Sequence, residues 1–78
     1  MVKVKFFGVL SDAMPEKDEQ GFWHISASGK TVEDVLKLTS IKEKNIRYSI
    51  YVNNVRKDHD YILTEGDTLT IMPLLAGG

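Results

Sequence analysis

The stretch Leu63–Pro73, LTEGDTLTIMP, is the segment from which the fold can be predicted. Residues 68–72 alternate polar and apolar side chains with the period of two that is typical of a β-strand, which places Leu69 and Ile71 on one face. The acidic turn Glu65–Asp67 precedes this segment, and the proline at its end stops a strand because it has no N–H to donate. We therefore expect the last strand of a sheet at residues 68–72.

Other segments of the chain also predict strands. Residues 2–7, VKVKFF, alternate with the same period, and residues 22–27 and 48–52 are rich in strand-forming residues. Asn53-Asn54 indicates a tight turn, because asparagine tolerates a positive φ, and Val55 begins a brief edge strand after it. We expect the first and last strands to lie side by side in the middle of the sheet.

One main helix is expected between the second and third of these strands. Thr31 can cap its N-terminus, and the helix runs over about residues 32–38 with Val32, Val35 and Leu36 on one stripe, which Thr39 extends. A short helical turn is expected at residues 9–14. The fold class is therefore α+β: a mixed sheet of four to five strands with one main helix packed on one face.

The composition excludes several classes of protein. The 78 residues suffice for one small domain, and they include no cysteine, which excludes disulfides and thiolate metal sites. Ten basic and 11 acidic residues give a net charge of −1, which is not the footprint of a nucleic-acid-binding protein. No apolar run approaches the roughly twenty residues of a membrane span. We expect a cytoplasmic protein with no nucleic-acid or membrane partner.

A conventional active site cannot be assembled from these residues. His24 and His59 have no partner at the spacing of a metal site, so we expect surface or hydrogen-bonded histidines and no metal. The carboxylates near one loop lack the spacing of a calcium loop, and we expect them to form a solvated, turn-forming surface. They are Asp58, Asp60, Glu65 and Asp67.

The C-terminal residues 74–78, LLAGG, are the remaining candidate for chemistry. They follow the expected last strand and contain no charged side chain, whereas a solvated tail would normally be polar. Five extended residues reach roughly 17 Å, which is enough to enter a cleft of another protein. Glycine has no Cβ, so Gly77 and Gly78 can pass a narrow channel and bring a terminal carboxylate close to a nucleotide.

The motifs TVEDVLKL, YVNN, LTEGDTLTIMP and LLAGG, in this order, resemble the ubiquitin-like β-grasp sulfur carriers of the MoaD/ThiS family over essentially the whole chain. The resemblance implies a β-grasp domain at residues 1–73 and a flexible tail at residues 74–78. It also implies that Gly78 is adenylated and converted to a thiocarboxylate, with Gly77 as its required small neighbour. The segment KVKFFGVLSDAMPE favours the small subunit of molybdopterin synthase within the family.

The resemblance also implies partners. A ubiquitin-activating-type adenylyltransferase would use ATP to activate Gly78, and the sulfur would pass to the large subunit of molybdopterin synthase or to another acceptor. The chain would then be a carrier with no bound cofactor and no catalytic activity of its own. Three alternatives stay open: a carrier for thiamine thiazole or cysteine synthesis, a protein modifier joined through Gly78, and an interaction module whose two glycines are incidental.

The expected partner surface lies on the sheet face opposite the helix. Strand alternation assigns Phe7, Tyr51 and Met72 to this face, and an exposed apolar patch there is a candidate docking site. The tail residues Leu74, Leu75 and Ala76 are expected to contribute to partner binding as well.

Overall fold

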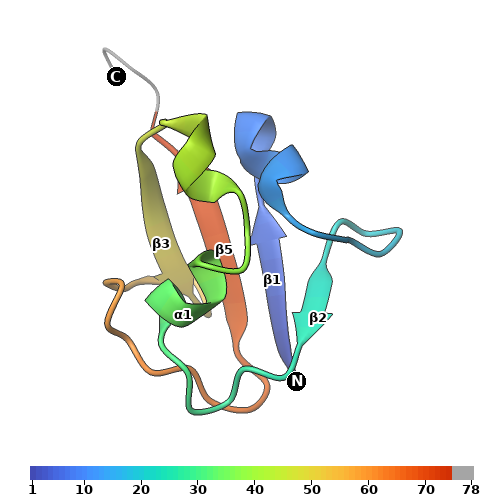
Figure 1. Ribbon diagram of the computed structural model, residues 1–78. Helices are drawn as coiled ribbons and strands as arrows, with labels where there is room; N and C mark the ends of the chain where they lie inside the picture. Colours follow the sequence, from blue (N-terminus) through green and yellow to red (C-terminus); the bar gives the residue numbers. More distant parts are fainter. Residues whose placement is uncertain (75–78) are drawn as a thin grey trace.

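The computed structural model describes residues 1–74 of the chain as one mixed sheet that carries its helical segments on one side (Figure 1). The five strands are β1 (Val2–Phe6), β2 (Trp23–Ile25), β3 (Tyr48–Val52), β4 (Val55–Arg56) and β5 (Thr68–Pro73), in the spatial order β2-β1-β5-β3-β4. The helical segments are the 3₁₀ helix η1 (Gly8–Ala13), the α-helix α1 (Val32–Leu36) and the 3₁₀ helix η2 (Ile41–Lys44).

The central pair of strands is parallel. β1 runs beside β5 with Val4 opposite Leu69 and Phe6 opposite Ile71, while the other neighbouring strands are antiparallel. The predicted α+β class and the central position of the first and last strands are confirmed. Because the two strands are parallel, both of their C-terminal ends lie at the same edge of the sheet, which is also where the described part of the chain ends (Figure 1).

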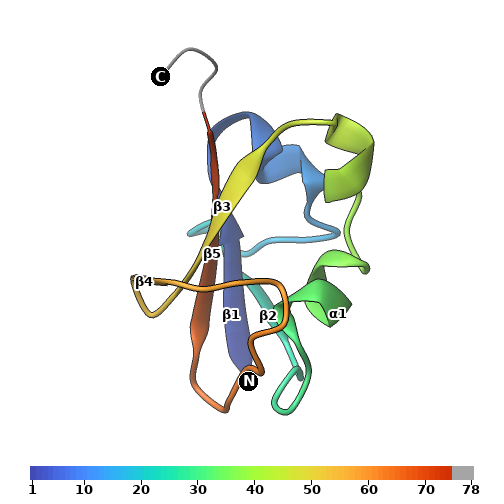
Figure 2. The same ribbon diagram turned by 90° about the vertical axis from the view of Figure 1, so that its left-hand side faces the viewer.

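The core lies between the sheet and the three helical segments, which Figure 2 shows on one side of the sheet. Alternate residues of β1 and β5, and Ile50 and Val52 of β3, face this side and are buried. The largest core side chains, from strands, helical segments and loops together, are all fully buried: Phe6, Leu10, Leu36, Ile41, Leu63, Leu69 and Ile71. No helical segment of residues 1–74 covers the opposite side of the sheet (Figure 2).

The helix begins as predicted and ends earlier. The Thr31 hydroxyl accepts the Asp34 N–H at 3.1 Å, and the Asp34 carboxylate accepts the Thr31 N–H at 3.1 Å, which together form a capping box. The end at Leu36 follows from Thr39, whose hydroxyl donates to the Leu36 carbonyl at 2.7 Å and accepts the Ile41 N–H at 3.2 Å. Thr39 therefore terminates the helix and is not part of its apolar stripe.

Two further expectations are corrected. The second strand spans only Trp23–Ile25, because Phe22 exchanges hydrogen bonds with Asp18 in the preceding loop, N–H to Oδ1 and C=O to N–H. Asp67 does not belong to a solvated surface: it is 5% exposed and accepts hydrogen bonds from Asn53 Nδ2 and from the Thr64 N–H, each at 2.8 Å.

Candidate functional site

The chain leaves the sheet at the end of β5, beside the start of η1 and the start of β3 (Figure 1). Pro73 is the last paired residue of β5, opposite Tyr48, and the Leu74 N–H still donates to the Arg47 carbonyl at 2.9 Å. The predicted tail is thus tied to the domain at its first residue. The other predicted tail residues, Leu75, Ala76, Gly77 and Gly78, lie outside the described part of the chain.

Gly8 allows the close packing at this exit. Its φ is +58°, in the left-handed region, and a Cβ there would lie 3.4 Å from the Pro73 side chain. Glycine adopts this conformation without steric cost, so the chain can turn sharply from β1 into η1 next to β5. The turn from β1 into η1, near the N-terminus, therefore lies directly beside the end of β5, where the chain leaves the sheet.

Phe7, Tyr51 and Met72 lie on the face of the sheet opposite the helices, as the alternation predicted. Met72 is paired with Ser49, and Tyr51 is paired with Thr70. Both pairs alternate with the core-facing residues of β3 and β5, so they lie on the open face of the sheet. Phe7 and Met72 are 37% and 38% exposed, and the Phe7 N–H donates to the Ile71 carbonyl at 3.0 Å. An apolar patch therefore lies beside the chain exit; its role in binding stays a prediction.

The same face carries ordered lysines that the sequence-based prediction did not include. The Lys5 ammonium lies 5.1 Å from the centre of the Phe7 ring and 5.0 Å from that of Phe22, and the Lys3 ammonium lies 4.8 Å from the Phe22 ring. Attraction to an aromatic face favours this position of the ammonium group and leaves its positive charge unneutralised. The signal in the sequence was the Val-Lys-Val-Lys alternation of residues 2–5.

Comparison with known proteins identifies the family. The model of the ThiS family matches residues 4–78 of the chain, up to the last glycine. The chain belongs to the ThiS family. It is accordingly a ubiquitin-like sulfur carrier of the ThiS/MoaD type, and the predicted resemblance is confirmed. No match was found among the curated proteins.

Solved structures share the fold of this ThiS-family chain. The solution structure of Urm1 from Trypanosoma brucei superposes with a TM-score of 0.67 and 17% identity over 99% of this chain and 94% of that protein. Subunits 1 and 2 of the molybdopterin-converting factor of Helicobacter pylori form a complex of which one chain matches at a TM-score of 0.60 and 24% identity, over 99% and 97%. The solution structure of the HVO 2177 protein of Haloferax volcanii superposes with a TM-score of 0.66 and 19% identity, over 99% of this chain and 85% of that protein. These structures confirm the β-grasp fold.

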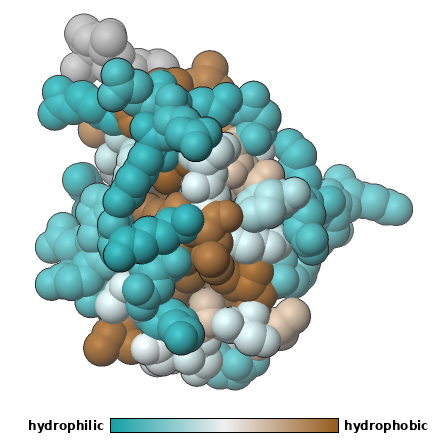
Figure 3. All heavy atoms as spheres, viewed as in Figure 1, coloured by the Kyte–Doolittle hydropathy of each residue, from teal (hydrophilic) through white to brown (hydrophobic). Residues whose placement is uncertain are grey.

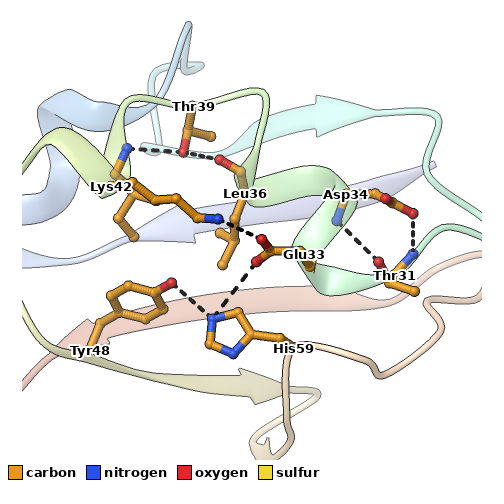
Figure 4. Close-up of polar contacts among 9 residues, drawn as sticks. Thr31, Glu33, Asp34, Leu36, Thr39, Lys42, Tyr48 and His59 are labelled. Carbon is orange, nitrogen blue, oxygen red and sulfur yellow. Dashed lines mark hydrogen bonds and ion pairs between the residues drawn. The ribbon is translucent and has the colours of Figure 1, made fainter.

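The histidines of the ThiS-family chain serve surface hydrogen bonds, as expected. His24 Nε2 lies 2.7 Å from Asp18 Oδ2. His59 Nε2 lies 2.9 Å from the Tyr48 hydroxyl and 4.0 Å from a Glu33 carboxylate oxygen (Figure 4). Among residues 1–74, no group of three His, Cys, Asp or Glu residues is placed to hold a metal ion.

The cluster in Figure 4 joins α1 to β3 and η2. Lys42 Nζ donates to Glu33 at 2.5 Å, and this hydrogen bond lowers the pKa of the Glu33 carboxyl, while burial raises the pKa of Tyr48. Lys42 and Glu33 neutralise each other's charge, and the Tyr48–His59 contact joins β3 to the loop that precedes β5. We interpret the cluster as structural.

A shallow hollow of about 270 Å³ lies between β2 and α1. Figure 1 shows that α1 and the end of β2 lie at the opposite end of the fold from the chain exit. The apolar wall of the hollow is formed by Ile25, Ala27, Val35 and Leu38. Figure 3 shows apolar surface, in brown, on the helical side of the fold. In the part of the chain that the structure describes, no helix is long and apolar enough to cross a membrane.

Proposed function

We propose that the chain carries sulfur as a thiocarboxylate on Gly78. The Gly78 carboxylate attacks the α-phosphate of ATP on an activating enzyme, which releases pyrophosphate and leaves an acyl-adenylate. Hydrosulfide from the sulfur donor then attacks the carbonyl carbon, AMP departs with the bonding electrons, and the terminal carboxylate becomes a thiocarboxylate. ATP belongs to the activating enzyme, and the chain is the substrate of this reaction and not its catalyst.

The observation that carries the proposal is the family match, which reaches Gly78. The geometry of the exit supports it. Leu74 is fixed to Arg47 at the end of β5, so the four residues beyond it begin at a defined point of the domain. Four residues extend roughly 14 Å at most, which suits insertion into a partner's active site. Small residues at 76–78 are compatible with a narrow channel.

We further propose that the sulfur is delivered to molybdopterin synthesis, with the large subunit of molybdopterin synthase as the acceptor and the cytoplasm as the location. The likeness of KVKFFGVLSDAMPE to the small subunit of that enzyme favours this pathway. One neighbour in fold is a chain of a two-subunit molybdopterin-converting factor, which is compatible with a large-subunit partner. Sulfur delivery to thiamine thiazole or cysteine synthesis is the alternative.

Mass spectrometry of the intact chain tests the chemistry. After incubation with the activating enzyme, ATP and a sulfur donor, we expect a gain of about 16 Da, the difference between sulfur and oxygen. A variant without Gly77 and Gly78 is the matched control and should gain nothing. A chain that is never adenylated would refute the proposal. Conjugates to lysine that survive boiling in thiol would instead support a protein modifier.

The pathway has its own test. The purified thiocarboxylated chain is offered separately to the large molybdopterin synthase subunit with its pterin precursor and to a thiazole synthase with its substrates. Loss of the sulfur mass from the chain, coupled to product formation, should occur with the first enzyme. Transfer only in the thiazole reaction would contradict the molybdopterin assignment and leave the carrier chemistry intact.

The proposed docking patch is tested by charge substitution. Phe7→Asp and Met72→Asp should each weaken activation while the fold is retained, because they place a charge in an apolar contact beside the exit. Leu38→Asp is the matched control, since Leu38 is 64% exposed on the helical side. Activation kinetics that are unchanged in the first two variants would exclude Phe7 and Met72 from the interface. Tyr51, further along β3, should have a smaller effect.

A further inference from the structure

The charges of the chain are unevenly distributed between the sheet and the rest of the fold. All 11 acidic residues lie outside the five strands, in loops and helical segments, whereas the strands contain Lys3, Lys5 and Arg56. The chain as a whole has a net charge of −1. The strands themselves therefore form a positively charged layer in a protein that is almost neutral.

The three cations lie on the open face. Lys3 and Lys5 alternate with the buried Val2, Val4 and Phe6 and so point away from the core. Arg56 is the cross-strand partner of Tyr51, and directly opposed residues share a face. The three positive groups consequently share the surface that carries Phe7 and Met72.

The two lysines are held in position by aromatic rings. Lys5 stands between Phe7 and Phe22, and Lys3 stands over Phe22. Gly21, whose φ of +89° favours glycine, turns the chain next to Lys5, just before Phe22. Among residues 1–74, neither ammonium group has a carboxylate within ion-pair distance, in contrast to Lys42 and Lys44, which are paired with Glu33 and Asp12.

Lys5 lies on the exit side of this cationic site, whereas Lys3, opposite Thr68, lies further from the exit along β1. Phe7, which contacts Lys5, is followed by Gly8 beside Pro73, so the site, the apolar patch and the exit form one continuous surface. A partner that binds the tail and extends along the open face of β1 would cover the lysines as well. Covering an ordered ammonium with a neutral surface would cost its hydration, whereas a carboxylate opposite it would compensate that cost.

From this arrangement we propose that the Lys3–Lys5–Phe22 site binds a cluster of carboxylates on the activating enzyme and orients the tail toward its nucleotide site. The inference rests on the proposed function, because it assumes that an activating enzyme binds the tail. It adds the chemistry of the partner surface: acidic residues facing β1 and β2, beside an apolar contact to Phe7 and Met72.

The test compares two double variants with the same change of net charge. Lys3→Glu/Lys5→Glu reverses the site, and Lys30→Glu/Lys37→Glu reverses two exposed lysines next to α1. Both are titrated against the ubiquitin-activating-type adenylyltransferase encoded in the same genome, by calorimetry for binding and by ATP–pyrophosphate exchange for activation. Lys3→Gln/Lys5→Gln, a milder variant, is measured in parallel, and circular dichroism verifies that each variant is folded.

We expect Lys3→Glu/Lys5→Glu to raise the Kd about tenfold at low salt (about 50 mM) and to lose most of this effect at high salt, where exposed charges are screened. The neutral variant should fall between it and the unchanged chain, and the Lys30/Lys37 variant should stay within about twofold. Equal effects of the two charge reversals, or no binding by the unchanged chain, would overturn the inference.

The two proposals fail in different ways. A chain that binds the enzyme through Lys3 and Lys5 but is never adenylated would refute the sulfur-carrier function and support the docking site. A chain that is adenylated equally well in every variant would refute the docking site alone. Lysine-dependent binding to phosphatidylserine vesicles, with unchanged affinity for the enzyme, would identify a membrane as the acidic partner and also overturn the proposal.

Discussion

The substitution Asp67→Asn should destabilise the domain although it replaces a single oxygen by an amide nitrogen. The two carboxylate oxygens accept two separate donors, Asn53 Nδ2 and the Thr64 N–H, each at 2.8 Å. An asparagine at position 67 offers one acceptor, and its amide group would face one of these donors. The Asn53 side chain cannot reverse to compensate, because its oxygen already accepts the Thr68 N–H at 3.0 Å.

The magnitude follows from the loss of one hydrogen bond to a charged group. Such a bond contributes about 1.5–3 kcal/mol, and an unsatisfied donor costs a similar amount where water cannot reach it. Asn53 and Thr64 lie at the surface, so water can replace part of the lost interaction. We therefore expect a loss of about 1–2 kcal/mol, a substantial part of the roughly 5 kcal/mol available to a domain of this size.

The effect should depend on pH. Burial raises the pKa of the Asp67 carboxyl, but the hydrogen bonds from Thr64 and Asn53 outweigh burial and hold the pKa below its ordinary value. A carboxyl whose pKa is lowered by folding contributes stability above its unfolded pKa of about 3.9. It loses this contribution as the pH falls through the folded pKa. The difference between the unchanged chain and Asp67→Asn should be full at neutral pH and shrink below about pH 4.

Urea unfolding followed by the fluorescence of Trp23 measures this difference, since the single tryptophan is 7% exposed in the folded state. Asp60→Asn, in the loop before β5, is the matched control because Asp60 is exposed. Equal stability of the two variants at neutral pH would refute the reasoning. The reasoning would also be refuted if the difference in unfolding free energy between Asp67→Asn and the unchanged chain were the same at neutral pH and at about pH 3.

Three further substitutions test the parts of the fold that position the exit. Thr31→Ala should lower the free energy of unfolding in urea by about 1 kcal/mol, because it removes the acceptor for the Asp34 N–H. Thr31→Ser keeps a hydroxyl there and should keep most of the stability. Gly8→Ala should cost about 1–2 kcal/mol, because it forces a side chain into a positive φ and against Pro73; an unchanged stability would contradict the described turn. Leu36→Ala should cost about 2–5 kcal/mol, since Leu36 is fully buried, and a smaller loss would mean that the core collapses around the gap.

Local patterns in the sequence were sufficient to predict most of the fold. Alternation located β1, β3 and β5, and the Thr31 cap located the start of α1, because these signals arise within a few neighbouring residues. The positive φ of Asn53 and Asn54 follows in the same way from their side chains. The ends of the elements were less predictable: β2 is shortened by Asp18 and α1 by Thr39, and each depends on a side chain beyond the element itself.

The burial of Asp67 could not have been found from its neighbours in the sequence. The residue follows a glycine turn, which normally lies in solvent, and its partner Asn53 is 14 positions away. Its backbone carbonyl also accepts the Lys3 N–H at 3.0 Å, so the turn before β5 is tied to β1 and to the β3–β4 turn at once. Acidic composition alone indicates a solvated loop, and only the folded arrangement shows that one of the four carboxylates is internal.

The candidate site has the same dependence on distant parts of the chain. Phe7 and Leu74 are brought to one edge because β1 and β5 are parallel, and Phe22 reaches Lys3 and Lys5 only because β2 pairs with β1 after a long loop. A peptide consisting of the last residues would therefore carry the glycines without the docking surface. If activation requires both, unfolding the domain should abolish it while Gly78 stays chemically intact. A denatured chain or a tail peptide that is adenylated as fast as the folded protein would show that the enzyme recognises the glycines alone.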